Sequence, residues 1–511
     1  LEYSGIVTVE IPSGKVSDTS NNSNNASTIT SGIDLPGGDA SNGGTVIDVV
    51  NPIWEKVSAT IDEINGIATV NLRGTDKYFA SSSLTSDKIK VYVSGVETSS
   101  GLTKTLSDAV ELTEERSVNG VTTTAQYGVD HTFTLKGIPA NATQLKLLIP
   151  AGTITDTSGN TNKDTIITLF NMLKETSTEN LIKSPFLENT KLERQNIENI
   201  TFLSSTTAKN STAWDVSATG DGSILAWYVT QSNGAVRVYI GSDGLIFGNP
   251  NSSNLFAYIG YGSNCTATET ITNINLLHTG NVTNMSEMFW YTGYRSMTKL
   301  DLGKNFSTQN VTNMSKMFAG TGYTKMTQIS LGDKFDTSNV IDMSWMFADF
   351  GNKALTSFDL GANFKTSKVI NMSYMFANCG SEAMTSLNLG DNFDTTTVTD
   401  FSYMFDLCGT NKLTSLYLGA KFNTSNAVSM RKMFRKLGTT SLTSLDLGPA
   451  FVKITDDANE SENFIEDFGK SGAVIYAPES IYSDKTHFRL SSSSTTTMQY
   501  SSGTINLKYM P

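Results

Sequence analysis

Residues 297–322 read MTKLDLGKNFSTQNVTNMSKMFAGTG, and residues 326–351 repeat the pattern as MTQISLGDKFDTSNVIDMSWMFADFG. Each unit ends its MSxMF segment with a phenylalanine, and these phenylalanines follow one another in equal steps of 29 without an insertion. They are Phe289, Phe318, Phe347, Phe376, Phe405 and Phe434. A fixed period of about 20–50 residues indicates a solenoid, in which similar coils stack and bury a shared core.

The apolar residues of one unit predict a short strand followed by a short helix. Leu300 and Leu302 alternate as in a strand with one buried face, and Gly303 allows the chain to turn. The second half of the unit has apolar residues at i, i+3, i+6 and i+7, which would form one stripe on a helix. These residues are Val311, Met314, Met317 and Phe318. We therefore expect an α/β solenoid with a parallel sheet on its concave side.

The repeated motif resembles that of a known family. LxxLxLGxxF followed by TxxVxxMSxMF is similar to the BspA-type leucine-rich-repeat surface proteins of bacteria, in their variant with MSxMF repeats. The resemblance implies a leucine-rich-repeat fold, display on the cell surface and adhesion to proteins or to other cells. It implies no catalytic residues and names no partner.

The composition narrows the classes of function. The chain has 511 residues, a net charge of −12 and a pI near 4.9, which argue against nucleic acid or an anionic membrane as partner. No apolar run is long enough for insertion into a membrane. Because the sequence has no starting methionine and no signal peptide, we expect a fragment of a longer exported protein, extracellular on the bacterial cell surface.

The three cysteines do not form a disulfide framework. Cys379 and Cys408 are one period apart, so they should face each other in adjacent coils. Two interpretations remain open for them, a disulfide or a pair of buried free thiols.

A second internal similarity precedes the repeats. VTVEIPSGKVSDTSNNSN at residues 7–24 returns as LKLLIPAGTITDTSGNTN at residues 145–162, so that Ile11 matches Ile149 and Asp18 matches Asp156. We therefore predict that residues 1–25 are the tail of one domain whose next copy is complete. Short runs of alternating apolar residues, separated by turn residues, predict an all-β sandwich over residues 45–172. This segment resembles the immunoglobulin-like domains of bacterial surface stalks.

The predicted fold class is multidomain: an all-β immunoglobulin-like sandwich, then an α/β leucine-rich-repeat solenoid with a β-rich N-terminal cap and a short C-terminal cap. The predicted boundaries are 1–25 for the tail of a preceding immunoglobulin-like domain, 26–44 for a linker, 45–172 for the sandwich, 173–270 for the N-terminal cap, 271–476 for the solenoid and 477–511 for the C-terminal cap. The first coil differs from the others, because its segment from Ile274 to Val282 is shorter than the equivalent segment from Leu300 to Val311.

One turn of the predicted sandwich has the composition of a calcium loop. In DTSGNTN, alternate side chains could offer oxygen atoms to calcium, namely those of Asp156, Ser158, Asn160 and Asn162. The alternative is a hairpin turn in which these side chains hydrogen-bond to their own backbone. No other cofactor is expected.

The positions that vary between repeats are the candidates for ligand binding. The residue between Ser and Met-Phe is Trp345, Tyr374 and Tyr403 in three consecutive coils, which would make an aromatic stripe on the predicted helix side. The alternative is that these rings pack on neighbouring coils. On the predicted concave strands, a second variable column contains Asp301, Asp359 and Tyr417.

The sequence gives little support for catalysis. The three histidines fall in three different modules, and no HExxH, GxSxG or P-loop pattern occurs. Asp301 and Asp359 could reach the separation of a glycosidase carboxylate pair simply because coils stack.

We therefore predict a monomeric, non-enzymatic adhesin that binds a host or bacterial surface protein, a glycan or other cells. A structural scaffold or spacer of the cell envelope is the alternative, and an enzyme acting on surface polysaccharide is a third interpretation.

Overall fold

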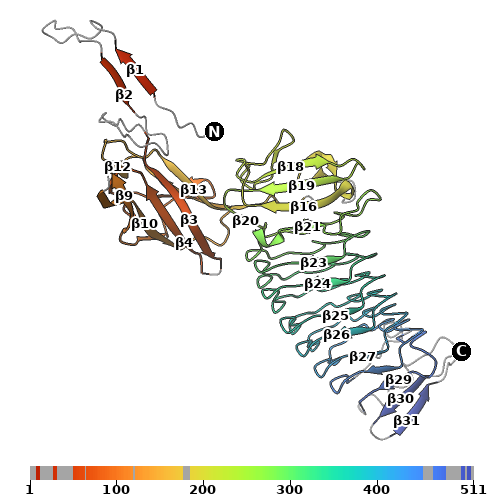
Figure 1. The fold of residues 1–511 in the computed structure, drawn as a ribbon. Coiled ribbons are helices and arrows are strands. Elements are labelled where there is room, and N and C mark those ends of the chain that lie inside the picture. Colours follow the sequence, from red (N-terminus) through yellow and green to blue (C-terminus); the bar gives the residue numbers. More distant parts are fainter. Residues whose placement is uncertain are drawn as a thin grey trace. The chain divides into compact units, whose positions relative to one another are not determined.

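The computed structural model describes residues 7–11, 27–31, 50–63, 65–118, 121–176, 185–452, 464–465, 467–478, 496–500 and 503–507. The chain divides into two compact units, Leu1–Leu169 (unit 1) and Phe170–Pro511 (unit 2), and each is described by itself. Both units are built almost entirely from strands and turns (Figure 1). None of the helices within the described ranges has the length and apolar character needed to cross a membrane.

Two sheets and one short strand pair account for most of unit 1. The first sheet contains, in order, β3 (Ile53–Asp62), β4 (Ile67–Thr75), β10 (Val121–Lys136) and β8 (Thr103–Leu106), and β9 (Val110–Val118) also pairs with β10. In the second, β13 (Thr165–Met172), β11 (Gln144–Ile149), β6 (Lys90–Val93) and β7 (Val96–Glu97) are neighbours. The short pair joins β12 (Ile154–Asp156) to β5 (Phe79–Ser82).

Alternating side chains give these sheets their buried faces. Along β4 every second residue is buried, including Val70 and Leu72. Phe133 of β10 and Leu147 of β11 are fully buried as well. Unit 1 therefore has its own apolar core, while its assignment to the immunoglobulin-like class stays a prediction.

The first strands lie where the sequence analysis expected a domain tail and a linker. β1 (Val7–Ile11) pairs with β2 (Ser27–Ser31) in antiparallel register, so part of the predicted linker 26–44 is a strand. The other residues before Val50 lie outside the described ranges.

Unit 2 begins with a cap of short sheets. Its main sheet contains, in order, β17 (Trp214–Asp215), β18 (Leu225–Thr230), β19 (Val236–Gly241), β16 (Ile197–Leu203) and β21 (Ile271–Thr272). β16 runs parallel to both β19 and β21. The smaller elements are β14 (Pro185–Phe186), β15 (Asn189–Glu193), β20 (Leu245–Phe247), β22 (Leu277–His278) and the 3-10 turns η1 (Arg194–Asn196) and η2 (Ile274–Leu276).

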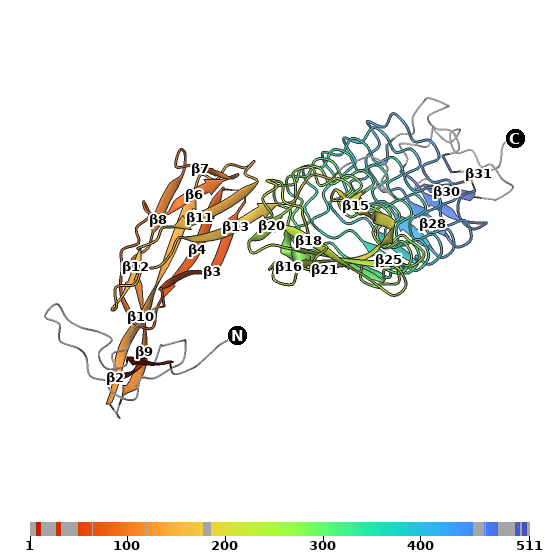
Figure 2. The same cartoon turned by 90° about the horizontal axis from the view of Figure 1, so that it is seen from above.

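The repeats follow as a stack of coils, each with one three-residue strand. The coil strands are β23 (Lys299–Asp301), β24 (Gln328–Ser330), β25 (Ser357–Asp359), β26 (Ser386–Asn388), β27 (Ser415–Tyr417) and β28 (Ser444–Asp446). They pair in parallel with a register of one period, so that Leu300 lies opposite Ile329. Seen from above, β16, β21, β25 and β28 lie along one side of the coils (Figure 2). β29 (Val474–Tyr476), β30 (Thr496–Tyr500) and β31 (Gly503–Leu507) extend the last of these sheets.

The expected sheet is not continuous. β23 pairs with β24 and β25 with β26, whereas β24 and β25 belong to different sheets. The coil strands are therefore grouped in pairs along the stack.

The predicted α/β solenoid is wrong, because the second half of each repeat contains no helix. Within the described ranges the helical elements are two 3-10 turns, η1 in the cap and η2 at the start of the first coil. In an α-helix each N–H would bond to the carbonyl four residues earlier. Here the N–H of Met288 donates to the carbonyl of Met285, and the N–H of Phe289 donates to Met317 in the next coil. The chain forms successive turns, in which backbone N–H groups donate alternately to a carbonyl of the same coil and to a carbonyl of the next coil.

The spacing of the apolar residues explains the error. Intervals of three residues, as between Val311, Met314 and Met317, satisfy a helical stripe and also a run of three-residue turns. The backbone at Lys316 has φ = 55°, in the left-handed region that an α-helix excludes. The equivalent position is left-handed in each of the six repeats, at Glu287, Lys316, Trp345, Tyr374, Tyr403 and Lys432.

Stacked phenylalanines fill the centre of the solenoid. The six phenylalanines that define the period are fully buried, and the ring centroids of successive members are 5.2–5.7 Å apart. A buried threonine column lies beside them; for example, Thr308 Oγ1 donates to the carbonyl of Asp336 at 2.8 Å and Thr366 Oγ1 to that of Asp394 at 2.8 Å. The fixed residues of the repeat are therefore explained by packing and by bonds between coils.

Candidate binding site

The structure brings the three aromatic side chains of the predicted stripe into one stack. The ring centroids of Trp345 and Tyr374 are 3.9 Å apart with an interplanar angle of 9°, and those of Tyr374 and Tyr403 are 4.4 Å apart at 7°. Trp345 is 37% exposed, whereas the two tyrosines are half-buried. We call these three residues the aromatic stripe.

The neighbours of the aromatic stripe restrict how a ligand could reach it. The inner ring faces cover one another, and at one end Lys432 Nζ lies 5.6 Å from the centroid of the Tyr403 ring. One coil before Trp345, Lys316 Nζ pairs with Glu287 Oε1 at 3.0 Å. A ligand would therefore contact ring edges and polar groups, and it could not insert between the rings.

Tyr374 shows that the stripe also packs on the coils. Its ring contacts a small apolar cluster that includes Ala348 and Ala377. Burial, with a smaller contribution from Tyr403, raises the pKa of the Tyr374 hydroxyl, which therefore stays a neutral hydrogen-bond donor near pH 7. Both interpretations of the stripe, recognition and packing between coils, have support in the geometry.

The second predicted column has a structural role in the turn after each strand. Asp301 Oδ1 accepts a hydrogen bond from the N–H of Gly303, and Asp359 Oδ1 accepts one from Gly361, both at 3.0 Å. Asn388 and Asp446 make the same bond to the glycine two residues later. This local bond explains why Asp and Asn recur in the column.

The column does not gather its predicted members at one place. Asp301 lies opposite Ser330 and Asp359 opposite Asn388, in two separate strand pairs. Tyr417 is 52% exposed on β27, opposite Asp446.

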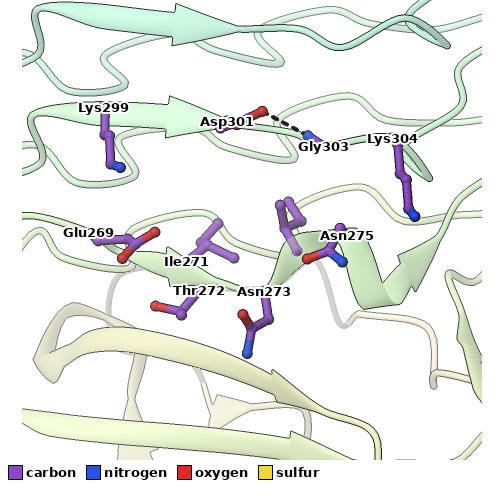
Figure 3. A pocket seen from close by; sticks show the side chains of 10 residues that line it. Glu269, Ile271, Thr272, Asn273, Asn275, Lys299, Asp301, Gly303 and Lys304 are labelled. Carbon is purple, nitrogen blue, oxygen red and sulfur yellow. Dashed lines mark hydrogen bonds between the residues drawn. The ribbon is translucent and has the colours of Figure 1, made fainter.

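Asp301 instead belongs to an open hollow that the sequence analysis did not identify (Figure 3). The hollow has a volume of about 460 Å³ and lies where the cap meets the first coils. Side chains from the cap, the first coil and β23 surround it, as Figure 3 shows. They are those of Glu269, Ile271, Thr272, Asn273, Ile274, Asn275, Lys299, Asp301 and Lys304, with Gly303 contributing backbone.

A second hollow adjoins the first. It has a volume of about 420 Å³ and shares Glu269 and Thr272 with its neighbour. Its remaining lining residues are Asn199, Thr201, Arg237, Tyr239, Thr266, Ala267 and Thr268. In the sequence, the only sign of an irregularity at the hollows was the shortened first coil. It did not predict which cap residues would lie next to that coil.

The sequence analysis also missed an aromatic cluster beside the first coils. Its members are Tyr258, Tyr261, Trp290, Tyr291, Tyr294 and Tyr323, with ring centroids of neighbouring pairs 4.7–5.8 Å apart. Tyr291 lies over Gly320, where an added Cβ would clash with its ring. Burial raises the pKa of Tyr258 and Tyr291. The cluster joins the cap segment to the first two coils.

In unit 1, the Asp156 and Asn162 side chains of the predicted calcium loop accept hydrogen bonds from protein donors. Asp156 is 2% exposed, and its Oδ1 accepts bonds from the N–H groups of Ser158 and Asn160, both at 2.8 Å. Asn162 Oδ1 accepts bonds from the N–H groups of Thr153 and Ile154. Among the described residues there is no group of three or more His, Cys, Asp or Glu side chains placed to hold a metal. These bonds favour the hairpin turn, and calcium binding stays a prediction.

The cysteines are free thiols. Cys265, Cys379 and Cys408 are buried, and the latter two do not form a disulfide although they belong to adjacent coils. Burial raises the pKa of the Cys265 thiol to about 11 and raises those of Cys379 and Cys408 as well.

Comparison with known protein families gives a match that falls on the repeats. Residues 261–388 and 361–443 match the model of a family described as "Mycoplasma protein of unknown function, DUF285". The repeats are similar to this family. Its description assigns no function, and neither a curated protein nor a solved structure matches the chain. The matched residues nevertheless coincide with the segment in which the 29-residue repeats occur.

Proposed function

We propose that this chain is a non-enzymatic binding protein of the bacterial cell surface, an adhesin whose repeats hold a host or bacterial protein, a glycan or another cell. The observation that carries the proposal is that the constant and the variable positions of each repeat have different environments. Fixed residues such as Phe347 and Thr366 are buried and bonded, whereas the aromatic stripe is variable and reaches the surface. Variation at exposed aromatic positions on a constant scaffold is typical of recognition surfaces.

Two further points support this proposal. The repeated motif resembles that of BspA-type surface proteins, and the matched family is described from a bacterial genus. The hollows near the cap are open to solvent, whereas pockets for small-molecule substrates bury most of the ligand surface. Asp301 and Asp359, the pair considered for catalysis, each bond to a glycine N–H in its own turn.

A binding screen tests the proposal. The full chain would be immobilised and exposed to matrix proteins, defined glycans and whole cells. The double variant Trp345→Ala with Tyr374→Ala removes two of the three stripe rings, and Tyr417→Ala removes an exposed ring from the strand column as the matched comparison. We expect saturable binding that the double variant weakens and Tyr417→Ala leaves unchanged.

Other results would change the conclusion in stated ways. Loss of binding in Tyr417→Ala alone would keep the adhesin function and move its site to the strand column. Self-association without any heterologous binding would favour a scaffold of the cell envelope. Turnover of a surface polysaccharide that Asp359→Asn abolishes would favour an enzyme.

A further inference from the structure

The two hollows beside the cap form one surface groove. They share Glu269 and Thr272, so a ligand could extend from the outer face of the cap sheet onto β23, the first of the coil strands. Figure 3 shows Thr272, Glu269, Lys299 and Asp301 around the part nearest β23. We call the combined lining of the two hollows the cap groove.

In the second hollow, the floor of the cap groove is the face of the cap sheet. Thr201 of β16 lies opposite Tyr239 of β19 on one side and opposite Thr272 of β21 on the other. The main-chain groups of β16 and β19 are therefore directed to neighbouring strands, whereas β21 and β23 each end a sheet beside the first hollow. An extended peptide could not add itself as a further strand over β16 and β19, so recognition in that part of the groove depends on side chains.

Several polar side chains of the floor are held in place. Asn199 Nδ2 donates to the carbonyl of Glu269 at 2.8 Å and to Thr272 Oγ1 at 2.9 Å. Thr201 Oγ1 donates to Asn199 Oδ1 at 2.8 Å. This chain of bonds fixes the hydroxyls and the amide before a ligand arrives, which lowers the entropic cost of binding.

The groove also has one fixed aromatic ring. Tyr239 lines it and stacks on the buried Trp227, with ring centroids 5.9 Å apart and an interplanar angle of 19°. Ile271 and Ile274 also line the groove, but they are only 5% and 4% exposed, so these two side chains offer little surface to anchor a protein partner.

The charges of the groove balance. Arg237 pairs with the buried Glu198 at 2.9 Å, which compensates its charge. The other cations, Lys299 and Lys304, are matched in number by the anions Glu269 and Asp301. A polyanion would meet as many negative as positive groups and gain no net attraction from them.

These observations point to a ligand that is neutral, rich in hydroxyl groups and extended. We propose that the cap groove binds a neutral oligosaccharide, a glycan ligand for the adhesin function proposed above, on which this inference rests. The Thr201 and Thr272 hydroxyls, which the Asn199 amide holds in place, and the charged side chains of the rim would bond to sugar hydroxyls, and the Tyr239 ring would contact a sugar face.

Calorimetric titration of the full chain tests this inference. The neutral probes are chitohexaose, cellohexaose and maltohexaose, and the acidic probe is a hexasaccharide of galacturonic acid. The variant Glu269→Gln with Lys299→Ala alters two exposed side chains of the groove, so it should fold normally. Its matched control is Glu382→Gln with Lys353→Ala, an exposed ion pair on other coils with a separation of 3.6 Å.

We expect one of the neutral hexasaccharides to bind with an affinity that changes little with salt, because a neutral ligand has no charge to screen. The groove variant should weaken this binding about tenfold or more, since it removes hydrogen bonds to charged groups. The control variant should bind like the unaltered chain.

Three outcomes would overturn the inference. The first is unchanged binding in the groove variant, and the second is preferential, salt-sensitive binding of the acidic hexasaccharide. The third is no binding of any hexasaccharide while the chain still binds cells or proteins through Trp345 and Tyr374. In that third case the adhesin function would stand and only the cap groove would be rejected.

Discussion

Two glycines of the same repeat column provide a controlled test of how the coils pair. Gly332 and Gly361 both have φ = 79°, so an alanine at either position must adopt the left-handed region. A Cβ at Gly332 would meet the carbonyl oxygen of Gly303 at 2.5 Å, whereas a Cβ at Gly361 would meet nothing within 4 Å. The difference arises because β23 and β24 are paired, while β24 and β25 are not.

The expected magnitudes follow from these geometries. The left-handed conformation costs alanine about 1–2 kcal/mol, and the loss of chain freedom in the unfolded state returns about 0.4–1 kcal/mol. Gly361→Ala should therefore lower the free energy of unfolding by about 1 kcal/mol. Gly332→Ala must also push the paired coils apart, and overpacking of this kind adds about 1–3 kcal/mol.

Urea denaturation of the full chain measures this difference. Four of the five tryptophans lie in unit 2, so intrinsic fluorescence mainly follows the unit that contains both glycines. The midpoint should decrease more for Gly332→Ala than for Gly361→Ala, at an unchanged slope. Equal decreases would refute the paired arrangement of the coil strands, because they would mean that the two sites have the same space for a Cβ.

Three further results are expected. Iodoacetamide at pH 8 should leave Cys265, Cys379 and Cys408 unlabelled in the folded chain and label all three in urea, because burial shields the thiols and raises their pKa values. Labelling of the folded chain would contradict their burial. The hydrogen bond from Arg73 lowers the pKa of Asp130, so this pair stabilises unit 1 above about pH 4 and the stabilisation is lost as the pH falls through the lowered pKa. Asp130→Asn should therefore make the thermal midpoint of unit 1 less dependent on pH between about pH 5 and 2, and an unchanged profile would show that the pair contributes nothing. The far-UV circular dichroism spectrum should lack the double minimum of an α-helix, and its presence would restore the helical interpretation of the repeats.

The sequence predicted contacts between repeats well, because one unit recurs at a constant period. It predicted the backbone conformation within the unit much less well. The constant period places Leu300 in register with Ile329, and the structure pairs these two residues. The same period makes Trp345, Tyr374 and Tyr403 neighbours, although their stacking could not be derived from spacing. The helix was a wrong prediction because three-residue intervals do not distinguish a helix from successive turns.

Some signals of those turns were present in the sequence. Gly320, Asp349 and Asn378 share one column, and all three have a positive φ. These residue types tolerate the left-handed region better than others do, so their recurrence was evidence against a helix. The bulky Trp345 adopts the same conformation because bonds between coils impose it, and no local preference would have predicted that.

The cap groove could not be predicted from the sequence. Asn199 and Glu269 lie far apart along the chain, and the bond between them depends on how β16 and β21 pair in the cap sheet. Long-range pairing of this kind has no local signature. The repeats offered a period from which contacts could be inferred, and the cap offered none.

Saturable binding by the full chain is the measurement that tests the central proposal most directly. Labelled chain would be titrated onto intact cells and immobilised matrix proteins, with its association state followed by sedimentation at the same concentrations. The proposal predicts a saturable isotherm that unlabelled chain displaces, with the free chain remaining monomeric. Binding that never saturates, accompanied by self-association as the concentration rises, would contradict the adhesin function and favour a scaffold.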